Sequence, residues 1–141
     1  MAQNSLTRLT ISQAAADTAI EAATAKAAEI GVPMAISIVD ESGVLKAFRR
    51  MDGAELLSVE IATNKAYTAV SFGIPTHGWY EFIKNDPPLL HGIVHTPRLI
   101  VFGGGFPIAE DGKTIGGIGV SGGHYEQDMI VAQAALDALA G

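Results

Sequence analysis

The pattern of apolar positions predicts a long helix near the start of the chain. Thr10 and Gln13 have the spacing of a capping box, which satisfies free amides at a helix N-terminus. The helix is expected to run to about Ile30, because Gly31 is a natural C-terminal cap and Pro33 prevents continuation. Its apolar face is mostly alanine, and such small side chains predict close packing against a sheet or another helix.

Alternation of side chains with a period of two follows this helix and predicts a β-hairpin. Residues 34–40 read as one strand, residues 41–43 as a turn and residues 44–51 as the second strand. An Asp-Gly pair at 52–53 closes the hairpin. Two strands joined by so short a turn are expected to pair antiparallel.

The rest of the chain predicts further helices and three more strands. In chain order these are a helix over 56–72, a short helix capped by Thr76, an extended or turning path at 86–88, strands at 99–102, 107–109 and 114–121, and a closing helix over 124–139. Leu57, Ile61 and either Asn64 or Lys65 are expected near one stripe of the helix over 56–72. Short turns between successive strands favour an antiparallel sheet, so the fold class is α+β, with one domain over residues 1–141.

Composition and charge narrow the choice of partners. The 141-residue chain is 48% hydrophobic and only 17% charged, which favours a homo-oligomer that hides part of its surface. The net charge is -6, and no stripe of basic side chains is present to bind phosphate groups. Neither nucleic acid nor an anionic membrane is therefore expected as a partner. The absence of cysteine fits a reducing compartment, and no secretion leader or spanning segment is evident. The expected location is the cytoplasm.

Glycine clusters mark the last third of the chain as the place where function is concentrated. They stand at 103–105, 116–119 and 122–123, and the closing helix follows with Glu126 and Asp128 in its first turn. Repeated glycine indicates special backbone angles or the close approach of another group. The glycine spacing matches neither a P-loop nor a dinucleotide-binding motif. The pattern predicts a pocket without naming its ligand.

Four motifs in this order resemble the GlcG/HbpS-like family, which is related to the C-terminal domain of PduO-type proteins. They are RMDGA (50–54), KAYTA (65–69), GGGFPI (103–108) and GGIGVSGGHYEQD (116–128). The resemblance implies a profilin-like fold, in which a five-stranded antiparallel sheet has helices on both faces. It also implies assembly into dimers or larger homo-oligomers. Some members bind haem, whereas others lie among catabolic genes and have no settled activity.

Histidines are the first candidates for holding haem iron, because a neutral imidazole is a common axial ligand. Some haem-binding relatives place a histidine on the first helix, but residues 12–30 contain none here. His124, at the glycine-rich start of the last helix, is the most interesting of the four present. His91 and His95 are four residues apart, but a glycine and a proline nearby argue against the helix that would pair them. Each histidine can equally be a polar loop residue, and no metal site is predicted.

Charged residues in the matching motifs are candidates for chemistry. Arg50 could clamp a carboxylate, either a haem propionate or a small organic acid, or could simply end a strand in solvent. Asp52 fits an Asp-Gly turn, yet the resemblance raises it and Lys65 as candidates for proton transfer. Asp128 could act as a general base or only stabilise the start of the helix. Residues expected to line the ligand pocket with Arg50 are Gly104, Gly105, Ser121, His124 and Gln127.

Three functions remain open on these grounds. The first is a cytoplasmic, homo-oligomeric protein that binds a small molecule, with haem as a possible cofactor. The second is a catabolic enzyme acting on a small organic acid or ring-cleavage product, with Asp52, Lys65 and Asp128 as catalytic residues. The third is a structural or chaperone-like oligomer without a ligand. Whether the protein is an enzyme is left open.

Overall fold

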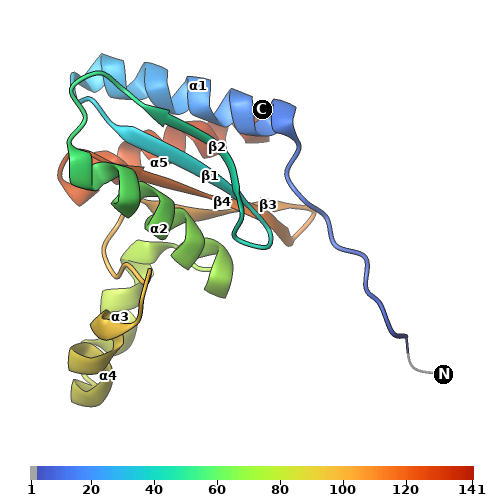
Figure 1. The fold of residues 1–141 in the computed structure, drawn as a ribbon, viewed down its shortest axis with the longest axis vertical. Coiled ribbons are helices and arrows are strands. Elements are labelled where there is room, and N and C mark those ends of the chain that lie inside the picture. Colours follow the sequence, from blue (N-terminus) through green and yellow to red (C-terminus); the bar gives the residue numbers. More distant parts are fainter. Residues whose placement is uncertain (1–2) are drawn as a thin grey trace.

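A four-stranded antiparallel sheet with helices on both faces forms the body of the protein (Figure 1). The structure is a computed structural model, and it describes residues 3–141. The body consists of α1 (Gln13–Ile30), β1 (Ala35–Asp40), β2 (Leu45–Arg50), α2 (Leu56–Phe72), β3 (Gly105–Glu110), β4 (Lys113–Ser121) and α5 (Tyr125–Ala140). The strand order is β2-β1-β4-β3. Helix α2 covers one face, and α1 and α5 pack side by side on the other. The predicted α+β class is confirmed.

Helix α1 begins two residues later than the capping box at Thr10 predicts. Ser12 is the N-cap, and its hydroxyl accepts a hydrogen bond of 3.1 Å from the Ala15 amide. The Ile11 amide donates to the Ile115 carbonyl at 2.9 Å, and this bond holds the preceding segment extended beside β4. That tertiary contact prevents an earlier start. The C-terminal cap is Gly31, as predicted, with a left-handed φ of 75°.

Helix α2 has the predicted bounds, but it buries a different face. Leu57 is 65% exposed, whereas the buried positions are small or polar. The reason lies in β4, where a side chain at Gly119 would overlap the Ala62 carbonyl and one at Gly117 would meet the Ala66 carbonyl at 2.6 Å. The glycines let the helix backbone lie directly on the strand, so larger side chains point away from it.

The sheet has four strands rather than the five expected, because residues 99–102 form no strand. The Thr68 hydroxyl, on α2, donates to the Arg98 carbonyl at 2.9 Å and accepts from the Ile100 amide at 3.0 Å. These side-chain bonds occupy backbone groups that a fifth strand would need for its ladder. The segment therefore follows α2 as an irregular chain into β3, which becomes the edge strand.

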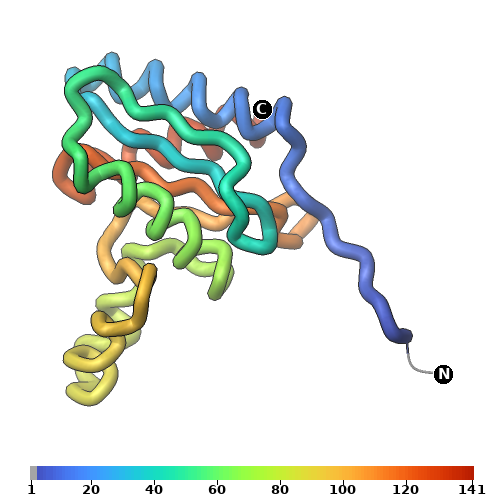
Figure 2. The backbone as a smooth tube through the Cα atoms, viewed as in Figure 1, coloured from blue at the N-terminus to red at the C-terminus, as the bar shows by residue number. Residues whose placement is uncertain are grey.

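A helical arm projects from the body between α2 and β3 (Figure 2). It contains 3-10 turns at Thr76–Gly78 and Ile93–His95 and the short helices α3 (Trp79–Ile83) and α4 (Pro87–Gly92). The extended path expected at Pro87 and Pro88 is wrong: Asp86 caps α4, and proline is tolerated in the first turn of a helix. A helix through His91 was not expected either. No helix among residues 3–141 is long and apolar enough to cross a membrane.

Candidate functional site

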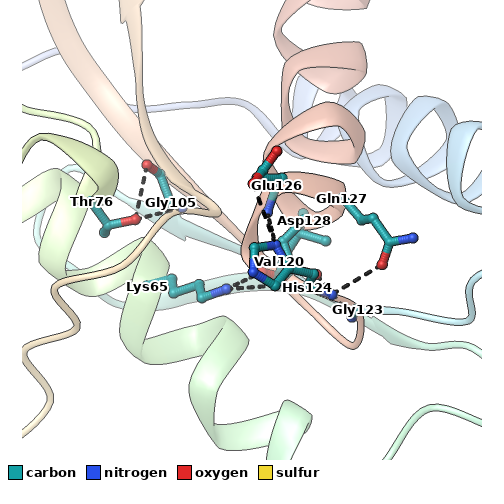
Figure 3. A network of polar contacts seen from close by, with 9 residues as sticks. All are labelled: Lys65, Thr76, Gly105, Val120, Gly123, His124, Glu126, Gln127 and Asp128. Carbon is teal, nitrogen blue, oxygen red and sulfur yellow. Dashed lines mark hydrogen bonds and ion pairs between the residues drawn. The ribbon is translucent and has the colours of Figure 1, made fainter.

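A buried ion pair joins the two helices that lie on opposite faces of the sheet (Figure 3). The Lys65 amine, from α2, donates to Asp128 Oδ2 of α5 at 2.8 Å and to the Val120 carbonyl at 2.9 Å. The lysine side chain is fully buried, and that of the aspartate is 3% exposed. Charged groups are rarely buried so completely unless they are paired, so the pair is a special feature of this molecule.

Glycines make room for this amine. Gly104 has a φ of 123°, and a side chain there would meet the Lys65 amine at 2.6 Å. Gly105 lies against the Lys65 carbonyl, and its amide donates to the Thr76 hydroxyl at 2.9 Å (Figure 3). The loop before β3 therefore closes directly over the lysine, and both glycines act as spacers for it.

The start of α5 is held by its own side chains. His124 is the N-cap: its Nδ1 accepts from the Glu126 amide at 3.2 Å, and its own amide donates to Gln127 Oε1 at 3.0 Å. Asp128 Oδ1 accepts from the Gly123 amide at 3.0 Å. Each carboxylate oxygen of Asp128 thus has one donor, and the free amides of the helix start are satisfied from within the protein.

Burial dominates the electrostatics of the pair. Loss of hydration raises the pKa of Asp128 and lowers the pKa of Lys65, while the attraction between the two groups opposes both shifts. Both shifts favour the neutral forms. A carboxylic acid beside a neutral amine is therefore closer in free energy to the ionised pair here than it would be in water.

Two neighbouring hollows open beside this pair. The first, called the His77 cavity, has a volume of about 450 Å³, and its lining includes His77, Tyr80 and Glu81. The second, called the Asp128 cleft, has a volume of about 280 Å³, and its lining includes Ser58, Ser121, His124 and Asp128. Phe102 and Tyr125 belong to the lining of both hollows. The two hollows therefore share an aromatic wall, and the Asp128 cleft adds polar side chains to a partly apolar lining.

Some of the residues singled out in the sequence meet at this place. Ser121, His124 and Asp128 line the Asp128 cleft, and Lys65 lies behind it. The side chain of Gln127 is used in the cap of α5, and Gly104 and Gly105 cover Lys65.

Other candidates lie apart from both hollows. Asp52 is exposed in the turn after β2, and Arg50 Nε donates to the Ala54 carbonyl at 3.2 Å. Neither residue lines the His77 cavity or the Asp128 cleft. His91 and His95 are exposed on the arm. Residues 3–141 contain no group of three or more histidines and acidic residues arranged for a metal ion.

The sequence analysis missed the aromatic residues of the site. Phe102 directly precedes the glycine cluster at 103–105, and Tyr125 stands two residues after the cluster at 122–123. Tyr125 also stacks on the His124 ring, with centroids 4.1 Å apart. Aromatic residues close to two of the three glycine clusters were the available signal, but the predicted strand over 99–102 assigned Phe102 to the core.

Comparison with known proteins identifies the family of this chain. A model of the family described as "Haem degrading protein HbpS-like" matches residues 11–137. The chain belongs to the HbpS-like family. An HbpS-like relative is an uncharacterized 15.0 kDa protein from the dhaT-dhaS intergenic region of Citrobacter freundii, 43% identical over 130 residues and 91% of each chain. The GlcG protein of Escherichia coli K12 is 34% identical over 115 residues, which are 82% of this chain and 84% of GlcG. The resemblance to the GlcG/HbpS-like family is confirmed.

Solved HbpS-like structures share the whole architecture. The crystal structure of Klebsiella pneumoniae protein ORFY has a TM-score of 0.94 and 38% identity, covering 100% of this chain and 98% of that one. The crystal structure of a PduOC:heme complex has a TM-score of 0.85 and 37% identity, covering 92% of this chain and 95% of that one.

Proposed function

We propose that the protein binds a small molecule and that haem is the leading candidate, with the His77 cavity as its site. The observation that carries the proposal is the chemistry of the lining. His77, Tyr80 and Tyr125 each offer a side-chain atom that ligates haem iron in other proteins, and Phe102 and Val101 supply an apolar wall. When bound, haem would supply the iron and redox chemistry, and the protein would supply the axial ligand and the shielding.

The lining also fits the acidic edge of haem in one orientation only. No lysine or arginine belongs to the described lining, and Glu81 would repel a propionate. The propionates are therefore expected to point out of the cavity into water. His77 packs edge-on against Phe106, with ring centroids 5.4 Å apart, and this contact orients the imidazole.

The comparisons support this proposal. The family description names haem degradation, and the PduOC relative was solved as a heme complex. Helix α1 has no histidine between Gln13 and Ile30, so the iron ligand must come from another element here. His77 is the imidazole in the larger hollow, and His124 is the one in the neighbouring cleft.

A hemin titration tests the proposal. Wild-type protein is expected to give a saturable shift of the Soret band. His77→Ala should weaken binding by at least about tenfold, which is roughly 1.4 kcal/mol. His91→Ala is the matched control, because it removes an exposed imidazole from the arm. A featureless wild-type titration would remove haem from consideration. Loss of the shift in His124→Ala alone would place the haem in the Asp128 cleft.

We also propose a homo-oligomer, a dimer or larger, that works in the cytoplasm. Large apolar side chains left uncovered support association: Phe82 is 69% exposed and Val94 is 52% exposed, both on the arm. The absence of cysteine is consistent with a reducing compartment. The single domain over 1–141 and the profilin-like description of the fold remain expectations from the sequence.

A second candidate function is catalysis on a small organic acid or carbonyl compound, and the buried pair favours it. Lys65 and Asp128 have pKa values shifted toward each other beside an open cleft, which is typical of acid–base sites. Asp128 is the group that reaches a ligand. Asp52 has no comparable surroundings, because it is exposed in a turn. Turnover that is lost in Asp128→Asn and kept in Asp52→Asn would support this candidate.

A further inference from the structure

Lys65 differs from every other lysine of the chain in its surroundings. The chain contains five lysines. Lys26 is half-buried, and Lys46, Lys84 and Lys113 are exposed. Lys65 alone is completely buried, in a position where a leucine or methionine could fill the same space without any loss of hydration. A buried amine of this kind either stabilises the fold through its ion pair or reacts with a ligand.

The position of the amine relative to the Asp128 cleft favours a reactive group. The amine lies 2.8 Å from Asp128 and 5.1 Å from the centre of the Phe102 ring. Both residues belong to the lining of the cleft. The amine is therefore one side chain behind the wall of the cleft, not deep within the core.

Phe102 is an exposed part of this wall. Its side chain is 42% exposed, and it belongs to the irregular segment that forms no strand. A rotation of the ring requires no change in the sheet. Such a rotation would join the cleft to the Lys65 amine.

We propose that Lys65 captures a small aldehyde or ketone from the Asp128 cleft as an imine, with Asp128 moving the proton. The cleft, at about 280 Å³, suits a carbonyl compound of a few carbon atoms. Ser58, Ser121 and His124 offer hydrogen bonds to hydroxyl groups on such a ligand. This inference rests on the second candidate function and does not depend on haem in the His77 cavity.

The step balances with the groups present. The lone pair of the neutral amine forms the carbon–nitrogen bond, and the carbonyl oxygen takes the proton of the Asp128 carboxylic acid. The new ammonium returns a proton to Asp128, which then gives it to the hydroxyl group as water leaves. The products are water and a protonated imine paired with the Asp128 carboxylate. Burial lowers the pKa of Lys65 and raises the pKa of Asp128, and both shifts favour the neutral amine and the acid from which the step begins.

Reductive trapping with acetaldehyde tests the proposal. Intact protein is treated with acetaldehyde and sodium cyanoborohydride at neutral pH, and adducts on each lysine are quantified by peptide mass spectrometry. Each unit by which an amine pKa falls raises its neutral fraction about tenfold at this pH. The pKa of Lys65 is lowered by burial, so the Lys65 adduct is expected to exceed that on each other lysine.

Two variants test whether Lys65 reacts because it captures a ligand from the cleft or only because its amine is accessible. Phe102→Ala is expected to speed the reaction at Lys65 and leave the surface lysines unchanged. Asp128→Asn, which keeps the shape and removes the acid, should slow it. Adducts on Lys26, Lys46, Lys84 and Lys113 with none on Lys65, in wild type and Phe102→Ala alike, would overturn the proposal. That result would leave the hemin titration unaffected, so the two functions fail separately.

Discussion

At the scale of single residues, the fold depends on how the buried charge of Lys65 is compensated. Taking an amine out of water costs several kcal/mol even after the protein relaxes. Here the amine has two hydrogen bonds, to Asp128 and Val120, and the face of Phe102 lies above it. The three contacts together stabilise the charge, so removing one partner leaves the other without compensation.

This coupling predicts a strongly non-additive mutant cycle. Lys65→Met and Asp128→Leu, made singly, are each expected to lower the free energy of unfolding by about 3–5 kcal/mol. The double variant should recover most of that loss, because two apolar side chains then fill the space. Urea unfolding measures all three. Lys84→Met removes an exposed pair with Glu81 and should cause no measurable change. Additive losses in the double variant would contradict the coupling.

The same residues predict how stability depends on pH in Lys65→Met. Burial raises the pKa of Asp128 and the lysine opposes that rise, so the pKa in this variant is expected to be higher still. The folded state then binds a proton more tightly than the unfolded state, and stability falls as pH rises through the carboxyl pKa. Urea midpoints of Lys65→Met should decrease as the pH rises above the ordinary carboxyl pKa of 3.8, whereas Lys65→Met with Asp128→Leu should show no such slope.

The sequence could supply these residues but not their contact. Motif resemblance singled out Lys65 and Asp52, and the place of Asp128 at the start of the last helix made it a third candidate. Lys65 and Asp128 are 63 positions apart, and their meeting depends on the middle of α2 lying beside the end of β4, after which α5 begins. Asp52 is exposed in the turn after β2 and is not among the residues that line the His77 cavity or the Asp128 cleft. No local sequence pattern distinguishes Asp52 from the two residues that form the buried pair.

At the scale of elements, glycines in β4 set the distance between the sheet and α2. Gly119→Ala is expected to destabilise the protein by about 3 kcal/mol or more, because the new methyl group would overlap the backbone carbonyl of Ala62. The backbones of β4 and α2 cannot shift to make room for the methyl group as a flexible side chain could. Gly92→Ala is the matched control, since open space surrounds that position in α4. Equal thermal midpoints for the two variants would show that the close approach is not required.

Elements with strong local signals were predictable, whereas those decided by tertiary contacts were not. Caps and glycine stops placed the end of α1 and both ends of α2 correctly. The segment 99–102 has the apolar run of a strand, yet the Thr68 hydroxyl, 30 residues earlier, takes its backbone bonds. The sequence of residues 99–102 contains no signal of this contact, because the hydroxyl belongs to α2.

At the scale of the whole molecule, the arm is stabilised less by the body than the other elements are. Helix α4 and the 3-10 turn after it contain no buried residue, and only Trp79 and Ile83 of α3 are buried. A segment with so little apolar contact gains little free energy from folding on a single chain. Exposed apolar side chains, including Tyr80, Phe82 and Val94, remain on it. A second copy that covers these side chains would supply the missing burial.

Assembly through the arm predicts a change in mass on mutation. Native mass spectrometry of the wild type is expected to show multiples of the 14.6 kDa chain. Phe82→Ser with Val94→Ser should shift the distribution toward the monomer, because each serine removes apolar area that association buries. Val44→Ser is the matched control: it removes a side chain that is 61% exposed at the β1–β2 turn, away from the arm. A wild type that stays monomeric at micromolar concentration would contradict the assembly. A shift produced by Val44→Ser alone would instead move the contact from the arm to the hairpin.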